Sequence, residues 1–263
     1  MMGFAVLVGQ AIALRGQLLP IPSILGYITA FTLTSSSMVL NDFYDRAVDK
    51  VNEPERPIPK GIIKPGEAVA LATVLAIVGL LTAFATNITS LLVAALSFAL
   101  AAFYNMEGKK KGLLGNLMVS GTVAVPFIYG SFIVDLFPSP LLLLFALLAF
   151  LSNTGREVIK GIADTEGDKL RRVKTLAITL GEKKSAVIAS LFYGSAVTIS
   201  FIPAILNIVS VLYVPFVIVT DAGFASAAAL ILKRPNAENA RRIKKLSLFW
   251  MFTGLVAFVV GGL

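Results

Sequence analysis

The sequence predicts an all-α integral membrane protein, a single domain (residues 1–263) folded as a bundle of transmembrane helices. Composition is the first observation behind this prediction. The chain is 57% hydrophobic and only 14% charged, whereas a soluble domain carries about 25% charged residues. The second observation is that apolar runs recur along the whole chain. Most of them approach the roughly 20 residues that span a hydrocarbon core.

Nine apolar runs predict nine transmembrane helices. The first run is short for a span, so we expect it either to start within the interface or to have lost residues upstream. It lacks a basic segment and a clear cleavage site, and is therefore not a signal peptide. The runs cover residues 1–14, 20–44, 67–84, 88–104, 116–134, 139–158, 185–203, 207–232 and 246–262.

The basic residues distinguish the two sides of the bundle. All of the 23 basic residues except Arg15 fall in four gaps between runs, and these gaps alternate with gaps that are nearly uncharged. The positive-inside rule places the basic gaps on the cytoplasmic side of a cell membrane. With this placement the net charge of +8 indicates contact with anionic membrane lipid, not with nucleic acid. The basic gaps lie near residues 45–66, 109–111, 156–184 and 233–245.

An acidic motif closes the second run. Asp42, Asp45 and Asp49 are spaced so that a helix stacks their carboxylates on one face, with Asn41 one turn before Asp45. Like charges on one stripe repel, and a hard divalent cation with oxygen ligands would resolve the repulsion. A solvated acidic helix end is the alternative interpretation.

The absence of certain residue types narrows the chemistry. The chain has no His and no Cys, which excludes zinc and haem sites and Cys- or His-dependent nucleophilic catalysis. A metal must therefore be held by oxygen, which favours Mg²⁺, Mn²⁺ or Ca²⁺. Of these, Mg²⁺ commonly binds phosphate oxygens as well.

A second pair, Asp164 and Asp168, closes the sixth run in the same way. A basic loop and then a Gly-Glu pair follow each motif, at Gly66-Glu67 and at Gly181-Glu182. We interpret this as a four-helix unit used twice, plus a ninth helix, although a similarity this short could be coincidence. Repeats of this kind place their binding site between the halves, so the two carboxylate clusters would face each other at the cytoplasmic mouth. Alternatively, Asp164 and Asp168 pair with Lys160 and the basic loop.

Opposed carboxylates could hold Mg²⁺ bridged by a diphosphate, with Arg and Lys on the remaining phosphate oxygens. Two prolines restrict the backbone next to Arg56, which makes it the first candidate for a diphosphate clamp. A single loop lysine could instead contact anionic lipid. A diphosphate at the mouth of an apolar bundle implies an isoprenyl diphosphate donor. The candidate diphosphate-binding residues are Arg56, Lys60, Arg156, Lys160 and Lys174.

Four further polar residues are candidate acceptor or cavity contacts. Lys109 could meet the phosphate of a lipid acceptor or form part of a solvated basic loop. Asp221 falls inside an apolar run, where a carboxylate usually faces the bundle interior. It could act on an acceptor hydroxyl, as hydrogen-bond acceptor or general base, or pair with a polar group on another helix. Tyr104 and Asn116 could contact substrate or simply be polar helix-end residues.

These motifs resemble those of the UbiA-type membrane prenyltransferases. Residues 41–49 match that family's N-D-x-x-D-x-x-x-D motif, and residues 164–168 match its second D-x-x-x-D motif. The resemblance extends over essentially the whole chain from Gly3. It implies a nine-helix bundle with a central cavity, Mg²⁺ dependence and prenyl transfer from a diphosphate. It makes the motif aspartates the catalytic and metal-binding residues. The Arg-Pro-x-Asn segment usual in the family's first helix has no counterpart here.

Four passages are similar to one branch of that family, the archaeal digeranylgeranylglyceryl phosphate synthases. This likeness implies transfer of geranylgeranyl from its diphosphate to geranylgeranylglyceryl phosphate, forming the second ether bond of archaeal membrane lipids. Prenylation of an aromatic ring, as in quinone or haem side-chain biosynthesis, is the alternative. A transporter of divalent cations or lipids is a further alternative. It is disfavoured, because a transporter should not need two acidic clusters on the same side of the membrane. The passages are residues 56–59, 104–116, 156–161 and 173–177.

Overall fold

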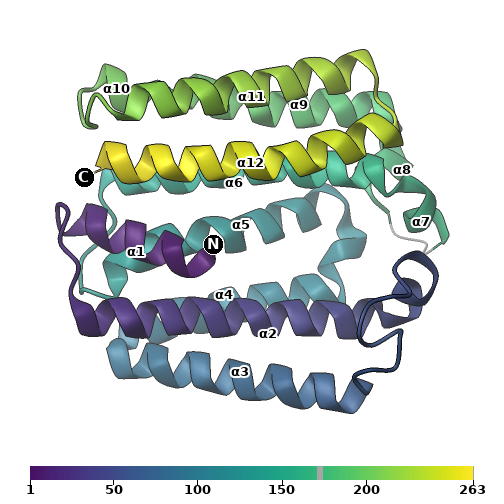
Figure 1. Ribbon diagram of the computed structural model, residues 1–263, viewed down its shortest axis with the longest axis horizontal. Helices are drawn as coiled ribbons and strands as arrows, with labels where there is room; N and C mark the ends of the chain where they lie inside the picture. The colour runs from purple at the N-terminus through teal and green to yellow at the C-terminus, as the bar shows by residue number, and fades with distance from the viewer. Residues whose placement is uncertain (171–173, 263) are drawn as a thin grey trace.

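The computed structural model describes residues 1–170 and 174–262. For six residues within that part it describes the backbone alone: Val48, Val51, Asn52, Glu166, Lys169 and Leu170. The basic residues Arg171 and Arg172, and Val173 of the family resemblance, lie outside the described residues. Within the described part the regular structure is helical (Figure 1), as the composition predicts.

Eight helices in the described part of the chain are long and apolar enough to cross a membrane. A further apolar helix, α1, is shorter, as its run of residues predicts, so the ninth crossing stays a prediction. The main helices are α1 (Met2–Ala13), α2 (Pro20–Asn52), α3 (Pro65–Thr86), α4 (Ile88–Met106), α5 (Leu113–Phe132), α6 (Pro140–Ala163), α9 (Glu182–Ser200), α11 (Tyr213–Lys233) and α12 (Ala237–Gly262). The short helices are η1 (Gly108–Lys111), α7 (Thr165–Leu170), α8 (Leu176–Leu180) and α10 (Ile202–Ile205).

Local signals explain where several helices begin. Proline occupies the first turn of α2, α3 and α6, where its missing N–H costs no hydrogen bond. Asn87 caps α4 by accepting a 2.7 Å hydrogen bond from the Ser90 N–H, and Ser139 caps α6 at 3.2 Å from the Leu142 N–H.

Two helix boundaries differ from the predicted runs. Helix α2 continues to Asn52, well past the predicted end at residue 44, because its polar last turns are still helical. Helix α11 begins at Tyr213, not at residue 207, because the chain turns at Asn207, whose φ is 53°. The first difference matters for function, since it puts the whole first acidic motif on one continuous helix.

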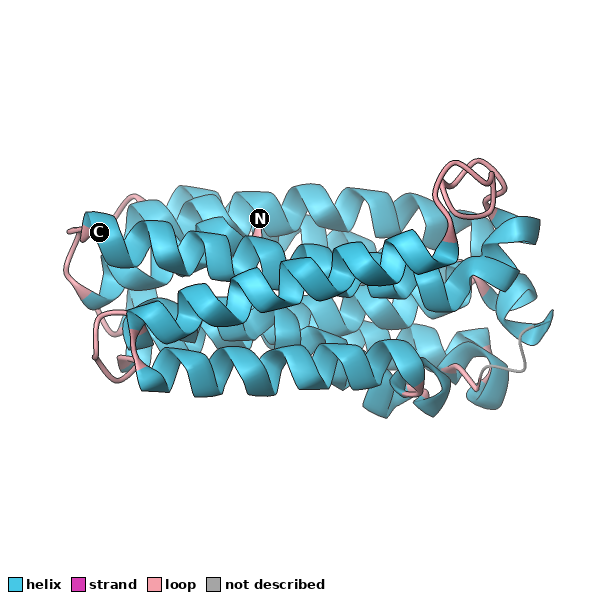
Figure 2. Ribbon diagram, turned by 90° about the horizontal axis from the view of Figure 1, so that it is seen from below, coloured by secondary structure: helices cyan, strands magenta, loops and turns pink. Residues whose placement is uncertain are grey.

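The helices lie side by side, with their connections gathered at two ends (Figures 1 and 2). Helix α2 packs against α3 and α4, while α6 packs against α9 and α12. Helix α5 contacts α1, α4 and α6, so it joins the two groups. The predicted division into two four-helix units plus a ninth helix stays a prediction, because α5 shares contacts with both groups.

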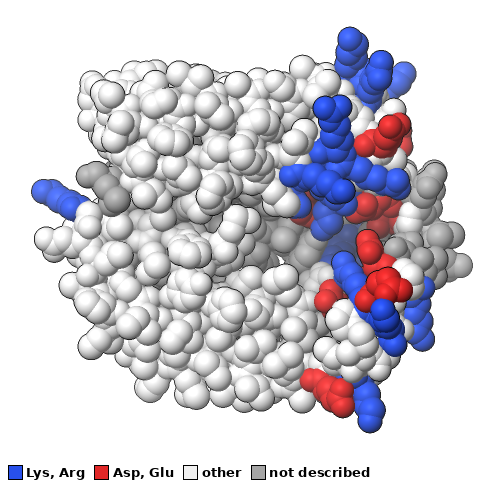
Figure 3. Space-filling view, viewed as in Figure 1, with Lys and Arg blue, Asp and Glu red and all other residues white. Residues whose placement is uncertain are grey.

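Charge is concentrated at one end of the bundle (Figure 3). The connections α2–α3, α4–α5, α6–α9 and α11–α12 all lie at this end, which we call the charged end. They are the four basic gaps of the sequence, so the predicted alternation of basic and nearly uncharged connections is confirmed. The opposite connections include Arg15 and Asp135.

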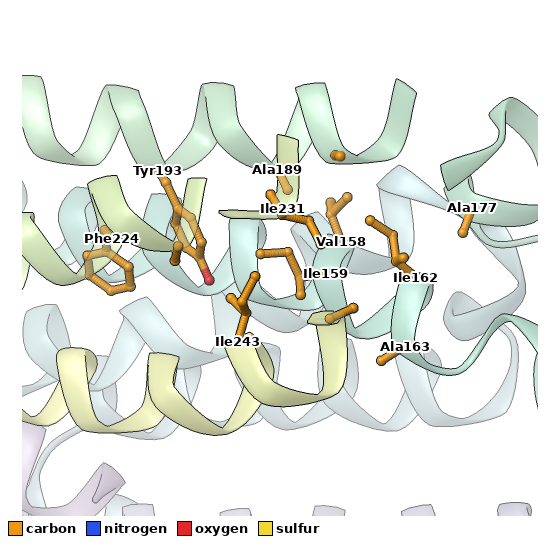
Figure 4. Packing of buried hydrophobic residues seen from close by; sticks show 13 residues of the cluster. Val158, Ile159, Ile162, Ala163, Ala177, Ala189, Tyr193, Phe224, Ile231 and Ile243 are labelled. Atoms are coloured by element: carbon orange, nitrogen blue, oxygen red, sulfur yellow. The ribbon is translucent and has the colours of Figure 1, made fainter. Parts of the chain in front are cut away.

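One face of α6 is fixed by a buried apolar cluster (Figure 4). Val158, Ile159 and Ile162 are almost fully buried against side chains of α9, α11 and α12. Tyr193 of α9 closes this cluster, and its hydroxyl lies 2.9 Å from Ser247 Oγ of α12. Residues three or four apart share a helix face, so this packing leaves Glu157 and Lys160 on the opposite face of α6.

Two apolar cavities lie on either side of α5. The first, of about 310 Å³, lies among α5, α6, α9, α11 and α12. The second, of about 330 Å³, lies among α2, α4 and α5. Val119 and Val123 of α5 line both cavities. Both volumes reach the range of small-molecule sites, about 300–1,000 Å³. The two cavities share lining residues, and the single central cavity implied by the sequence stays a prediction.

Candidate active site at the charged end

The carboxylates of the first motif stack along α2 and are joined by an arginine from the next connection. Arg56 Nη1 donates hydrogen bonds to Asp42 Oδ1 and to Asp49 Oδ2, each at 2.9 Å. Both oxygens contact one nitrogen, so they lie at most about twice that distance apart. The guanidinium therefore takes the position between carboxylates that the sequence assigns to a cation.

Asp45, the third carboxylate of this motif, is held by two other groups. Asn41 Nδ2 donates to Asp45 Oδ2 at 3.1 Å, and Lys109 Nζ donates to the same oxygen at 2.8 Å. Lys109 belongs to η1, so this ion pair ties α2 to the α4–α5 connection. Lys109, which the sequence predicts as an acceptor contact, thus bonds a carboxylate of the first motif.

Electrostatics show why the first motif calls for positive charge. Asp49 lies just beyond the apolar span Pro20–Ala47 and its side chain is only 4% exposed. Burial raises the pKa of the Asp49 carboxyl, the Arg56 guanidinium acts against this, and the neighbouring carboxylates of Asp45 and Asp42 raise the pKa further. A cation near these three residues stabilises their ionised form.

The second motif is arranged differently. Asp164 is the C-terminal cap of α6, and its Oδ1 accepts a 3.3 Å hydrogen bond from Lys244 Nζ of α12. Asp168 follows in α7, and its N–H bonds the Asp164 carbonyl at 2.9 Å. The partner that the sequence suggests for this pair, Lys160, bonds another carboxylate instead.

That carboxylate is Glu157, which was not predicted from the sequence. It accepts hydrogen bonds from Arg156 Nη1 at 2.9 Å and from Lys160 Nζ at 3.2 Å. Its side chain is 8% exposed, and it lines the first cavity. The sequence signal was weak, because Glu157 adjoins Arg156 at the charged end of its apolar run, whereas Asp221 lies in the middle of one. Lys244 was also missed, and no sequence signal separates it from its basic neighbours.

Tyr104 of α4 lies within electrostatic range of both motifs. Its phenol interacts electrostatically with Asp45 and with Asp168, as well as with Lys160 and Glu157. The α4–α5 connection also meets the connection after α7, because a side chain at Gly112 would lie 2.9 Å from the Lys174 carbonyl oxygen. Both motifs therefore approach one region of the charged end.

Other candidate residues lie at the edge of this region. Lys60 bonds Glu55 within its own loop and its side chain is half exposed, so the structure leaves it outside the cluster. Lys174 is exposed on the connection between α7 and α8. Asn116 is partly buried in the first turn of α5, where its carbonyl accepts a 2.7 Å hydrogen bond from Ser120 Oγ.

Asp221 lies deep in the first cavity. It is buried, and its Oδ2 accepts a 2.6 Å hydrogen bond from Ser200 Oγ of α9. It stands twelve residues from Lys233 at the charged end of α11, about 18 Å along a helix that rises 1.5 Å per residue. Pairing with a polar group on another helix was one of the two predicted interpretations of Asp221, and this is the contact that the structure shows.

The donor set at the charged end suits a hard cation. Within the described ranges, no three carboxylates converge in the arrangement of a metal site. Arg56 and Lys109 neutralise the first motif instead. The available oxygen donors are carboxylates and one amide, which is the ligand chemistry of Mg²⁺. The residues present therefore fit a magnesium ion, once the two cationic side chains find other partners.

Comparisons with known proteins agree with the fold and the motifs. A sequence model of the UbiA prenyltransferase family matches residues 2–253. The chain is 38% identical to the digeranylgeranylglyceryl phosphate synthase of Archaeoglobus fulgidus, over 90% of this chain and 83% of that protein. It is 33% identical to the synthase of the same name from Methanothermobacter thermautotrophicus, over 90% of this chain and 84% of that one.

Solved structures give the same result. A digeranylgeranylglyceryl phosphate synthase superposes with a TM-score of 0.82 at 31% identity, over 99% of this chain and 92% of that one. A UbiA homologue from Archaeoglobus fulgidus bound to GPP and Mg²⁺ superposes with a TM-score of 0.68, over 98% of this chain and 96% of that one. At 15% identity, this likeness is evidence for the fold alone. The protein belongs to the UbiA prenyltransferase family, an assignment that its sequence and its fold support independently.

Proposed function

We propose that this protein is a Mg²⁺-dependent intramembrane prenyltransferase that transfers geranylgeranyl from its diphosphate to geranylgeranylglyceryl phosphate, forming an ether. One observation carries the proposal: two acidic clusters and their cations lie at the charged end, beside two apolar cavities. The choice of donor and acceptor rests on the 38% identity to a synthase of that name.

The donor diphosphate binds at the charged end. Mg²⁺, when bound, would neutralise the charge that develops on the leaving diphosphate. The residues that would hold the ion are Asn41, Asp42, Asp45, Asp49, Asp164 and Asp168. Arg56, Arg156 and Lys160 bind the remaining phosphate oxygens, with Lys60 and Lys174 as further contacts from the loops.

The ion pairs at the charged end neutralise its carboxylates and cations when no substrate is bound. Arg56 and Lys109 hold the first-motif carboxylates, while Arg156 and Lys160 hold Glu157. On donor binding, Arg56, Arg156 and Lys160 exchange carboxylate partners for the phosphate oxygens of the donor, and Lys109 does the same with the phosphate of the acceptor. Phosphate oxygens are equally good acceptors of charge-assisted hydrogen bonds. The exchange keeps positive charge at the site throughout the reaction.

Two cavities suit a reaction that joins two apolar chains. The second cavity starts at Ser37 and Met38, one turn below Asn41, and takes the donor chain. The first cavity starts at Arg156 and Glu157 and takes the chain of the acceptor. Their apolar walls keep water from the allylic cation that forms as the C–O bond breaks.

The charged end faces the cytoplasm of a multi-pass cell-membrane protein. Its four basic connections fit the positive-inside rule, and the substrate head groups are charged and reach the site from that side. Tyr104, Lys109 and Asn116 lie along this approach and contact the acceptor head group. Membrane lipid surrounds the apolar outer faces of the helices.

A product assay with a panel of acceptors tests the proposal. The purified protein in lipid bilayers, with Mg²⁺ and labelled geranylgeranyl diphosphate, is expected to release diphosphate and to form a labelled ether only with a glycerol phosphate lipid acceptor. Prenylation of hydroxybenzoate without ether formation would replace this function by the aromatic one. Donor binding without diphosphate release in the presence of any acceptor would contradict an enzyme altogether.

A further inference from the structure

Glu157 is a buried carboxylate with no assigned role in holding the metal or the diphosphate. We propose that Glu157 is the catalytic base that accepts the proton of the acceptor hydroxyl as the ether bond forms. The inference rests on the proposed function, because it assumes a hydroxyl acceptor at the mouth of the first cavity.

The position of Glu157 suits this role. Its carboxylate lies on the α6 face opposite the buried cluster of Val158 and Ile159, and it lines the first cavity. It stands six residues before Ala163, the last residue of α6, so it lies about 9 Å inside the charged end at 1.5 Å per residue.

The other carboxylates are poorer candidates for the base. Asp221 lies about twice as far from the charged end by the same helical rise, and its Oδ2 already accepts from Ser200. The five motif aspartates are assigned to the metal ion. Among these carboxylates, all of them in the described part of the chain, Glu157 alone both borders a cavity and lies near the charged end.

The partners of Glu157 supply a way to control when its carboxylate oxygens are available. It bonds Arg156 and Lys160, the two cations of α6 assigned to the diphosphate. Each of its two carboxylate oxygens accepts a hydrogen bond from one of these cations, so an oxygen becomes available for the acceptor hydroxyl only when the cations turn to the donor. Tyr104 of α4 and Tyr193 of α9 are also within electrostatic range of Glu157. Tyr193, however, belongs to the buried cluster on the other face of α6, where its hydroxyl pairs with Ser247 of α12. Proton acceptance is thereby coupled to donor binding.

The step balances without any further reactant. The bond between the allylic carbon and the diphosphate oxygen breaks, and diphosphate leaves with the electron pair. The acceptor hydroxyl oxygen donates its own electron pair to that carbon and forms the ether bond. The hydroxyl proton passes to a Glu157 carboxylate oxygen and then leaves with the diphosphate or with water.

Glu157→Gln tests the inference, because it keeps the shape and an oxygen that Arg156 or Lys160 can bond. We expect ether formation to fall about 10²- to 10⁴-fold, the usual contribution of general base catalysis. Donor affinity, measured by binding with Mg²⁺, should stay within about threefold of wild type, because the diphosphate contacts remain. Diphosphate should still be released slowly, with geranylgeraniol in place of ether. Glu157→Asp should recover part of the ether formation.

Glu107→Gln is the matched control, since Glu107 is exposed and pairs with Lys110 outside the cavities. Ether formation by Glu157→Gln at a rate near wild type would overturn the inference. Equal losses of ether formation and donor affinity would overturn it too, because Glu157 would then only position Arg156 and Lys160. If Glu157→Gln does not fold, Glu157→Asp decides by the same comparison of rate and donor affinity. Failure of wild type to form any ether would instead overturn the proposed function, and the inference with it.

Discussion

The α2 side and the α6 side of the charged end carry the same kinds of side chain in opposite arrangements. On α2 the helix supplies three carboxylates, and the cations Arg56 and Lys109 come from other connections. On α6 the helix supplies two cations, Arg156 and Lys160, and they surround one carboxylate. The carboxylates of α2 are thus neutralised by cations from the connections, whereas the cations of α6 are neutralised by a carboxylate of the same helix.

This difference separates two tasks. A stripe of carboxylates on a rigid helix suits a metal ion, which needs several oxygens held at fixed positions. A pair of cations around a buried carboxylate suits phosphate recognition and proton transfer, because the same exchange of partners serves both. The α2 side and the α6 side therefore hold their charged groups in different ways, although each also carries an acidic motif.

The largest effect is expected from removing one motif carboxylate on either side. Asp45→Asn and Asp168→Asn should each lower diphosphate release by more than about 1,000-fold, because a metal ion contributes several kcal/mol to stabilising the leaving group. Release of labelled diphosphate from the donor measures this. Asp135→Asn is the control, since Asp135 lies on a connection at the opposite end and Asn tolerates its positive φ of 57°. Normal diphosphate release by either variant would contradict a metal site that is shared by the α2 side and the α6 side.

Arg56→Gln should produce the next largest effect. Charge-assisted hydrogen bonds are worth about 1.5–3 kcal/mol, so donor affinity should fall about 10- to 100-fold in a binding assay. The variant also leaves Asp49 buried without its cation, so Mg²⁺ should raise its thermal unfolding temperature more than that of wild type. An equal Mg²⁺ effect on both proteins would show that Arg56 does not occupy the position of a metal ion.

The sequence predicted the α2 side better than the α6 side. The stacking of Asp42, Asp45 and Asp49 depends only on helical spacing, and the single helix α2 preserves it. The partners of these residues depend on how loops fold back, and local spacing carries no such information. Lys244, from a helix 80 positions away along the chain, illustrates the limit.

The alternation of basic and uncharged connections was likewise readable, because it depends on a count of charges along the chain. The residues that line the two cavities were not readable, since they depend on where Val119 and Val123 of α5 pack against distant helices. Glu157 was harder to identify than Asp221, because it lies between Arg156 and Lys160, where a carboxylate is common, and not in the middle of an apolar run.

Filling one cavity at a time should have effects of intermediate size, on use of the donor in one case and on use of the acceptor in the other. Ala101→Phe narrows the second cavity and should lower the rate with geranylgeranyl diphosphate about tenfold relative to a shorter donor. Ala149→Phe narrows the first cavity and should raise the KM for the lipid acceptor by a similar factor. Steady-state assays with donors of different length separate the two. A reversal of the two results would exchange the assignment of chains to cavities.

Asp221→Asn should have the smallest effect. The amide oxygen still accepts from Ser200, and the position is far from the reacting atoms, so turnover should change by less than about threefold. Metal and diphosphate binding should be unaffected. A loss of turnover as large as that of Glu157→Gln would move the base from the mouth of the first cavity to its depth.

The central claim is that carboxylates from both motifs hold one metal–diphosphate assembly. Electron paramagnetic resonance of Mn²⁺, used in place of Mg²⁺ and titrated with diphosphate present, tests it most directly because it does not depend on turnover. The account predicts that wild type binds Mn²⁺ and that Asp45→Asn and Asp168→Asn each weaken this binding by at least about tenfold, since each removes a ligand. Binding by Asp168→Asn equal to that of wild type would contradict it, because the metal would then depend on α2 alone.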